Sequence, residues 1–539
     1  KKLSVLEEII RSIIFLVVAI QSLIPSNVLI PLDRRLSSLI GAVTCILCKL
    51  VFQSHSNAFK IAGNYVDVTV LVILASTMVI NFVIIRQPVV AKGLRSMSKS
   101  ILQSPSLGFW ILSAISFALS PLLMNDGVCL LLVTPFLESF DDVPSDEPDI
   151  TNDTIRNQET INVVEKSFFL LTIACSSNIG SSCSYTGNPQ NVIISETLEK
   201  SLSFRTFYIL MFFPALVCWI ITTSYLDYLR RQTHKTMSTI NNYSTVTDVE
   251  NDDLSDLPSN SLELRSQCKE TATTFESNTN IVDKKASQLN DIIQLTENSS
   301  KPIDLNSIAN APVLITLWLI VLIVLEFTDL VPLYGAYFLV AILSVSSILL
   351  FNYYFTATNP TKVADITKFT EDLFKDIDYN ILFIFTGLFI VAGSFLETGI
   401  PHLFWALISN GHKTLNLNSY KTLGVVCVFI TLASQLIGNV PVVFMAKEEM
   451  IVNSDDDRSR IFAGLLLAWV STVAGNFTLS GSAANIIVAE KAMRHKACPV
   501  HITALFHFKQ CGMITIICIA VGVGLLYMET ALLFGWKNS

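Results

Sequence analysis

Two short polar segments interrupt long apolar stretches of this chain, and they resemble each other. The first reads TGNPQNVIISE over residues 186–196 and the second SGSAANIIVAE over residues 480–490, so Asn191 and Asn485 correspond at an offset of 294 (485 minus 191). Hydroxyl and carboxamide groups bind a ligand by donating and accepting hydrogen bonds without charge. In a membrane, such interruptions are tolerated only where they are buried in protein or line a wet cavity. Paired interruptions in two halves therefore indicate the substrate site of a secondary transporter.

Two further segments carry polar residues at the centre of an apolar run. Leu107–Phe140 contains MNDG, and Leu423–Ile451 contains IGNVP. Each run is too long for one helix and is interrupted by residues that end helices, which predicts two re-entrant helical hairpins. A tip built from Asn and Gly offers a carboxamide and open backbone groups to a ligand.

We expect the two hairpin tips and the two broken helices to converge on one site without Lys or Arg. Its substrate should be neutral, or small with its charge balanced by a cation or by helix N-terminal dipoles. The alternative is that small polar residues merely join transmembrane helices, which fits any single serine better than it fits the paired set. The predicted binding residues are Asn125, Asp126, Gly127, Ser177, Asn178, Thr186, Gly187, Asn188, Asn191, Gly438, Asn439, Asn476, Ser480, Gly481, Ser482 and Asn485.

Asp126 is the one acidic residue in either hairpin tip, and Val440 stands at its counterpart. An ionisable side chain at membrane depth is costly and is a functional candidate by default. Burial favours the neutral form of a carboxyl group, so Asp126 is predicted to couple transport to a proton or another cation. The alternative is that Asp126 only caps a helix of the hairpin.

The other titratable residues are not assigned to the transport site. Glu196 and Glu490 end their helices and are expected to be solvated, and Glu326 and Asp329 end an apolar run and are expected at the membrane interface. His402, His495, His501 and His507 fall near membrane edges without partner spacing, so they are not assigned to a proton relay. The cysteines show no metal-ligand spacing. Cys129, Cys175 and Cys183 lie near the proposed site, where packing is the default and contact with a soft metalloid the alternative.

The composition requires a membrane protein around these residues. With 51% hydrophobic and 15% charged residues and a mean hydropathy of +0.54, the chain is too apolar for a soluble protein of 539 residues. No nucleic-acid-binding patch, cofactor motif or metal cluster is recognisable, and no HExxH, nucleophile elbow or phosphate loop indicates an enzyme. The runs long enough to cross a bilayer are Ile9–Ile30, Leu36–Phe52, Val66–Ile85, Ser203–Leu229, Ala311–Leu330, Tyr334–Phe351, Tyr379–Leu396 and Thr503–Tyr527.

The apolar runs fall into two halves with the same order of parts. Residues 1–231 and 307–539 each contain three spans, a hairpin, a broken helix and a last span, and the polar segment 232–306 reads as a disordered linker. Basic clusters at 86–99, 230–235 and 491–496 place the linker in the cytoplasm and give the halves opposite orientations. The sequence therefore predicts an all-α polytopic membrane protein of two inverted repeats, each with a re-entrant hairpin and a broken helix.

These motifs also resemble a known superfamily. The segment LLMNDGVCLLLVTPFLESF (122–140) is similar to the first hairpin of bacterial arsenite/antimonite efflux permeases. SSNIGSSCSYTGNPQNVIIS (176–195) and LLLAWVSTVAGNFTLSGSAANIIVAEKA (465–492) resemble plant silicon efflux transporters of the same ion-transporter superfamily. The resemblance implies a dimeric inverted-repeat transporter with scaffold and transport domains, which exports small uncharged metalloid acids against protons. Sodium–dicarboxylate carriers share that fold but place Ser-Asn-Thr at each tip, which argues against a carboxylate substrate here.

The sequence thus predicts a proton-coupled exporter of silicic acid or arsenite that works by alternating access. Two alternatives stay open, namely a sodium- or proton-coupled carrier of anions or dicarboxylates, and an anion or proton channel of the same fold. The expected partners are the small substrate, the lipid bilayer and a second copy of the chain in a homodimer, with no cofactor. A multi-pass protein of the plasma membrane is the favoured location.

Overall fold

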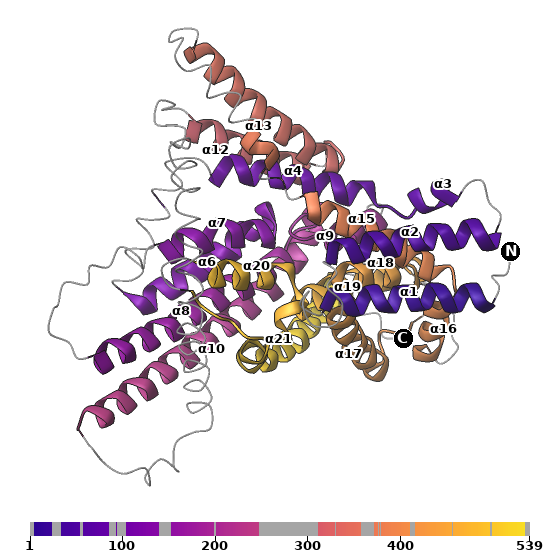
Figure 1. Ribbon diagram of the computed structural model, residues 1–539. Coiled ribbons are helices and arrows are strands. Elements are labelled where there is room, and N and C mark those ends of the chain that lie inside the picture. The colour runs from indigo at the N-terminus through magenta and orange to yellow at the C-terminus, as the bar shows by residue number, and fades with distance from the viewer. Residues whose placement is uncertain are drawn as a thin grey trace, which may run out of the picture.

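The architecture was examined in a computed structural model, shown in Figure 1. All regular structure in the described part of the chain is helical, as predicted. The structure describes residues 5–23, 34–53, 58–85, 93, 104–138, 152–198, 201–246, 311–328, 330–356, 371–375, 377, 379–409, 415–454, 456–495 and 499–533.

The helices of the first half follow the predicted order of three apolar segments, a hairpin, a broken helix and a last long helix. Their bounds are α1 Val5–Leu23, α2 Arg34–Gln53, α3 Ala58–Gly63, α4 Val68–Ile85, α6 Pro105–Leu123, α7 Asn125–Glu138, α8 Asn152–Ser181, α9 Pro189–Leu198 and α10 Phe204–Val246. α10 therefore extends past residue 232, and residues 247–306 of the predicted linker lie outside the described residues. The basic cluster at 86–99 lies outside them as well, except for residue 93.

The second half repeats this order. Its helices are α12 Ala311–Thr328, α13 Leu333–Thr356, α15 Tyr379–Leu396, α16 Ile400–Ile408, α17 Tyr420–Ile437, α18 Asn439–Lys447, α19 Asp457–Ala474, α20 Ala483–Met493 and α21 Ala504–Leu533. A π-helical turn, Glu448–Val452, follows α18, and a 3-10 turn, Leu479–Gly481, lies between α19 and α20.

Both predicted hairpins break at their polar centres. The break between α6 and α7 falls at Met124, which has a φ of 62°, and the break between α17 and α18 falls at Gly438, with a φ of 89°. Glycine adopts this region without penalty, whereas a side chain such as that of Met124 rarely does. The polar tip residues Asn125 and Asp126 thus lie at the start of α7, and Asn439 lies at the start of α18.

Several described helices are apolar and long enough to cross a membrane. They are α6, the Phe204–Thr236 part of α10, α17 and α21, and a fifth span arises if α15 and α16 are joined across their 70° bend. Shorter apolar helices occur within α2, α4, α12 and α13. The chain is therefore an all-α polytopic membrane protein, as predicted. The first arm of each hairpin, α6 or α17, is itself of spanning length.

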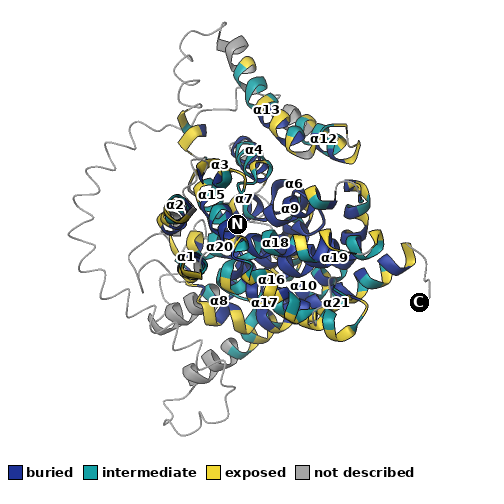
Figure 2. Cartoon of the chain, turned by 90° about the vertical axis from the view of Figure 1, so that its right-hand side faces the viewer, coloured by how far each residue is buried: buried dark blue, intermediate teal, exposed yellow. Residues whose placement is uncertain are grey.

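The helices form a buried central group with further helices packed outside it. α8 contacts α6, α7, α10 and α20, while α19 contacts α17, α18, α21 and α9. Outside this group, α1 packs with α2 and α15, and the α12–α13 pair packs on α4 (Figure 1). The burial colours in Figure 2 show α9, α18 and α19 largely buried, whereas exposed residues lie on the outer helices. The two broken helices thus occupy the centre of the molecule.

A network of charged side chains joins α1 and α2 to the turn after α15. Arg11 is fully buried and contacts the carboxylates of Glu7 and Glu397, the latter at 2.6 Å. Lys49, which is 1% exposed, lies 2.9 Å from Glu397, and the Tyr65 hydroxyl donates to the same carboxylate. Two buried cations thus depend on Glu397, because it is the acid that contacts both of them.

We expect Glu397→Gln to destabilise the protein by about 3 kcal/mol, since breaking a buried ion pair costs about 3–5 kcal/mol and this carboxylate is 35% exposed. The measurement is the free energy of unfolding in detergent, compared with that of Glu371→Gln, which removes an exposed carboxylate. Equal stability of the two variants would contradict a structural role for this network.

Candidate functional site

The two chain breaks, 182–188 and 475–482, are organised by asparagines at corresponding positions. Asn191 Nδ2 donates to the carbonyl oxygens of Ser181 and Ser184, at 3.4 and 2.9 Å. Asn485 Nδ2 donates to the carbonyl oxygens 10 and 7 residues before it, those of Gly475 and Thr478, at 2.8 and 3.1 Å. Because the spacing is the same in both halves, each asparagine folds its own break in the same way.

The glycine of each break lies against the backbone of the same break. A Cβ atom on Gly187 would collide with the Ser181 carbonyl group. A Cβ atom on Gly481 would stand 2.8 Å from the Gly475 carbonyl oxygen and 2.5 Å from Gln435 Oε1. The closeness of these contacts explains why both motifs carry glycine at this position.

The two broken helices also exchange contacts with each other. Ser482 Oγ donates to Asn178 Oδ1 at 2.9 Å, and Asn188 Nδ2 donates to Thr472 Oγ1 at 3.1 Å. The repeat offset of 294 carries Asn188 to Ser482 (482 minus 188) and Asn178 to Thr472 (472 minus 178). The second contact is therefore the first with the roles of the two halves swapped.

Asn178 is the centre of a chain of carboxamides. Its Nδ2 donates to Asn476 Oδ1 at 2.7 Å and to Asn485 Oδ1 at 3.1 Å. Its Oδ1 accepts from Asn125 Nδ2 at 2.8 Å as well as from Ser482. All five residues are buried, so this network joins the first hairpin tip to both broken helices.

The second hairpin tip lies beside the second broken helix. Gln435 Nε2, near the end of α17, donates to the Ala474 carbonyl oxygen at 2.8 Å, and Gln435 Oε1 accepts from Thr478 at 2.6 Å. Asn439 is next to Gly475, and its buried Oδ1 has no hydrogen-bond partner among the described residues. The tip thus presents an unpaired acceptor within the same region as the carboxamide network.

Among the described residues, no backbone N–H donates to the Asp126 side chain, as it would to a helix cap. The backbone N–H of Asp126 donates to Asn125 Oδ1 at 3.0 Å, so the side chain that bonds to the backbone here is that of Asn125. Within the described part of the chain, the buried Oδ1 of Asp126 has no hydrogen-bond partner. Gly127 packs against Asn81 of α4, which leaves no room for a side chain.

Three of the predicted residues have other surroundings. Ser177 Oγ donates to the Ala174 carbonyl oxygen and contacts Cys129 Sγ at 3.2 Å, which is packing within and between helices. Ser480 contacts Thr478 at 3.4 Å. Thr186 turns toward α12 and α13 rather than toward the carboxamide network.

Two titratable residues near the ends of apolar runs are buried. Glu326, expected at the membrane interface, is 3% exposed and accepts a hydrogen bond from Thr186. His507, expected near a membrane edge without partner spacing, is fully buried and its Nε2 lies 3.0 Å from the Asn476 carbonyl oxygen. Their burial was not predicted because the run lengths locate helix ends and say nothing of what packs over them. Glu196 and Glu490 are exposed, as predicted, and Asp329 lies outside the described residues.

The cysteines near the site are packed against other groups. Cys175 Sγ lies 3.6 Å from Cys511 Sγ, and both residues are buried. Cys183 is buried as well. Their positions agree with the packing interpretation.

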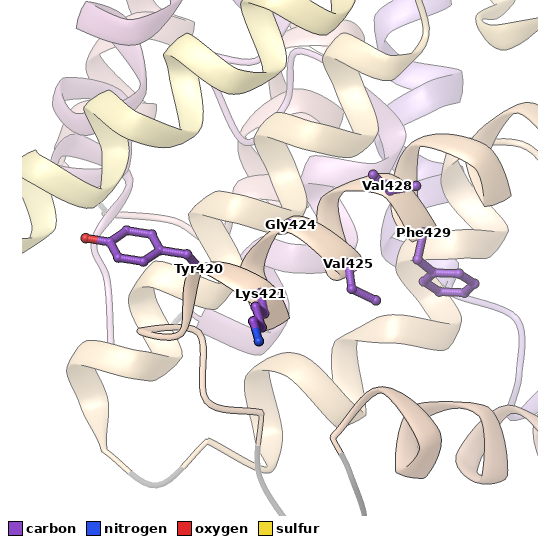
Figure 3. Close-up of a pocket in the computed structure, with 6 residues that line it drawn as sticks. All are labelled: Tyr420, Lys421, Gly424, Val425, Val428 and Phe429. Carbon is purple, nitrogen blue, oxygen red and sulfur yellow. The ribbon is translucent and has the colours of Figure 1, made fainter.

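A surface hollow of about 640 Å³ lies away from these residues. It is formed on the outer face of α17, where Figure 3 shows its lining side chains. Several residues of this face, including Tyr420, Val425 and Val428, are more than half exposed, as expected for a helix that meets lipid. The lining residues are Tyr420, Lys421, Gly424, Val425, Val428 and Phe429.

Comparisons with known proteins agree with this architecture. The chain is 37% identical over 126 residues to the silicon efflux transporter LSI3 of Oryza sativa subsp. japonica, covering 23% of this chain and 25% of that protein. It is 30% identical over 164 residues to the putative transporter arsB of Dictyostelium discoideum, covering 30% and 27%. These matches span only about a quarter of each relative. The model of the CitMHS family, described as citrate transporter, matches residues 14–474. The chain therefore belongs to the CitMHS citrate transporter family of membrane proteins.

Proposed function

We propose that this transporter exports a small neutral metalloid acid, silicic acid or arsenous acid, in exchange for protons. The observation that carries the proposal is the buried network of carboxamides and hydroxyls around Asn178. Such groups match the several hydroxyls of an uncharged acid, because each can both donate and accept. The names of the rice and Dictyostelium relatives, a silicon efflux transporter and a putative transporter arsB, support the same substrate class.

In this proposal the two halves, 1–231 and 307–539, are inverted repeats that work by alternating access. The swapped contacts Ser482–Asn178 and Asn188–Thr472 support a two-fold relation between them. A substrate held between two related broken helices can be released to either side when one group of helices moves against the other. The segment 232–306 is a cytoplasmic linker, and the protein is a homodimer of the plasma membrane.

Asp126 supplies the coupling in this account. Its Oδ1, which has no partner among the described residues, lies next to Asn125, and Asn125 bonds to the central Asn178. A carboxyl group near the substrate can take up a proton when the substrate has left, which links the two movements. The Oδ1 atoms of Asn191 and Asn439, which have no hydrogen-bond partner among the described residues, remain for the substrate itself.

The family description favours a second candidate, a carrier of citrate or a related carboxylate. A carboxylate in a site made of neutral groups requires a cation to balance its charge, because an unpaired charge in a low-dielectric site is costly. Transport of a carboxylate should therefore respond to sodium or a divalent cation, whereas transport of a neutral acid should not.

Counterflow in proteoliposomes tests the proposal. Vesicles loaded with unlabelled arsenous acid should take up labelled arsenous acid transiently above its equilibrium level, because a carrier exchanges one molecule for another. A channel gives no such overshoot. Uptake of labelled citrate with an overshoot, and none with arsenous or silicic acid, would contradict the proposed substrate.

A further inference from the structure

A second buried carboxyl group lies outside the carboxamide network. Glu326, near the end of α12, accepts hydrogen bonds at Oε1 from the hydroxyls of Thr186 and Tyr337, each at 2.9 Å. The Tyr337 hydroxyl is also 2.8 Å from Thr186 Oγ1. The three oxygen atoms thus form a closed triangle that joins α12 and α13 to the break between α8 and α9.

The surroundings of this triangle contain more acceptor oxygens than protons. The Pro121 carbonyl oxygen accepts from Thr186 at 3.5 Å, and the Leu122 carbonyl oxygen accepts from Tyr337 at 3.3 Å. The hydroxyls of Thr186 and Tyr337 each have one proton for at least two acceptors, and the Ser184 hydroxyl, 2.8 Å from Thr186 Oγ1, adds one further proton. A proton on Glu326 would add another donor to this cluster.

The groups around Glu326 also favour a proton on its carboxyl group. Within the described part of the chain, the titratable groups that face the carboxyl are Tyr337 from α13 and Tyr208 from α10, and both are phenols, which are neutral near pH 7. Within the described residues, no Lys, Arg or His contacts it. A buried carboxylate without a cation is costly, and a proton removes that cost.

The spacing and the chemistry of the oxygen atoms are those of a hydrogen-bonded cluster. The distances of 2.8 to 2.9 Å are those of O–H···O hydrogen bonds. Glu326 is the one carboxylate of the triangle, and among the described residues no group of three or more His, Cys, Asp or Glu side chains could hold a metal ion. The cluster therefore fits a proton.

The cluster is one residue from the substrate site. Thr186 precedes Gly187, and the Gly187 carbonyl oxygen accepts a hydrogen bond from the Asn125 backbone at 3.1 Å. An ionised Glu326 holds Thr186 and Tyr337 by charge-assisted bonds, which are about twice as strong as neutral ones. Protonation weakens this hold, so it loosens α12 and α13 from the chain break that contacts the first hairpin tip.

We propose that Glu326, Thr186 and Tyr337 form a second proton-binding site, which controls how firmly the α12–α13 pair holds the 182–188 break. Its part in transport rests on the proposed proton-coupled export. The binding of a proton at Glu326 does not depend on which substrate is carried.

The test is infrared difference spectroscopy of the full chain in lipid nanodiscs during a pH titration. The wild-type protein should show a C=O band of a protonated carboxyl group that Glu326→Gln lacks and the exposed control Glu371→Gln retains. Tyr337→Phe should shift this band to higher frequency, because the C=O group loses a hydrogen bond. Identical spectra for the wild type and Glu326→Gln, or a Tyr337→Phe spectrum without a shift, would overturn the assignment. A band that sodium chloride abolishes at constant pH would overturn it in favour of a sodium site.

Transport measurements separate this inference from the proposed function. If Glu326 is a coupling site, the pH profile of export by Glu326→Gln should differ from the profile that the wild type and Glu371→Gln share, because one of two proton-binding groups is lost while Asp126 remains. A pH profile of Glu326→Gln that matches the wild type would overturn the link to transport. If no metalloid acid is carried at all, the proposed function fails, while the infrared band still decides whether Glu326 binds a proton.

Discussion

Replacing Asp126 by Asn should abolish accumulation of substrate against its gradient while exchange of labelled substrate continues. The amide keeps the size and hydrogen-bonding capacity of the side chain but cannot bind and release a proton. The buried Oδ1 of Asp126 has no hydrogen-bond partner in the part of the chain that the structure describes, so this oxygen makes no structural bond there. The measurement compares accumulation driven by a pH gradient with exchange at equal pH in the same proteoliposomes.

Asp126→Glu is the matched control for this prediction, because it retains a titratable group at the same position. We expect it to accumulate substrate, at a lower rate, since the longer side chain must fit at the start of α7. If Asp126→Asn builds a gradient as high as that of the wild type, Asp126 does not couple transport.

Asn178→Asp should abolish accumulation and exchange together. The substitution turns the donor that faces Asn476 Oδ1 and Asn485 Oδ1 into an acceptor, so two hydrogen bonds are lost inside a buried network. Each buried group left unpaired costs about 1–3 kcal/mol. The two lost hydrogen bonds together should weaken substrate binding by about 3 kcal/mol. At about 1.4 kcal/mol per tenfold change, this is a more than 100-fold weaker affinity.

Thermal unfolding separates lost binding from lost folding in this variant. Asn418→Asp, at an exposed position, makes the same chemical change outside the network and serves as the control. Exchange by Asn178→Asp within a few-fold of the wild-type rate would mean that the network around Asn178 is not the substrate site.

The sequence predicted the main apolar helices and the polar centres at which both hairpins break, whereas the short helices α3 and α16 were not predicted. Long apolar runs predicted the helices, and the predicted run Tyr379–Leu396 has the same bounds as α15. The breaks at Met124 and Gly438 were visible because Asn, Gly and Pro stand at the centres of long apolar runs. These signals are local, so they can be read without knowing which helices are neighbours.

The parts that the sequence did not predict depend on contacts between distant helices. Glu326 and His507 lie near the ends of apolar runs, which suggested a position at the membrane interface or edge for each and did not reveal their burial. In the structure Thr186 and Tyr337 cover Glu326, and the break after α19 covers His507. The role of Asn178 as the centre of the network was likewise hidden, because its partners stand up to 307 residues away.

Accumulation of silicic and arsenous acid in proteoliposomes under an imposed pH gradient tests the central claim most directly. We expect labelled acid to rise above its equilibrium level when the gradient is imposed and to fall back when a protonophore dissipates it. Replacing sodium by choline should leave this accumulation unchanged. Accumulation that follows a sodium gradient and ignores the pH gradient, or citrate carried in place of both acids, would contradict a proton-coupled exporter of neutral metalloid acids.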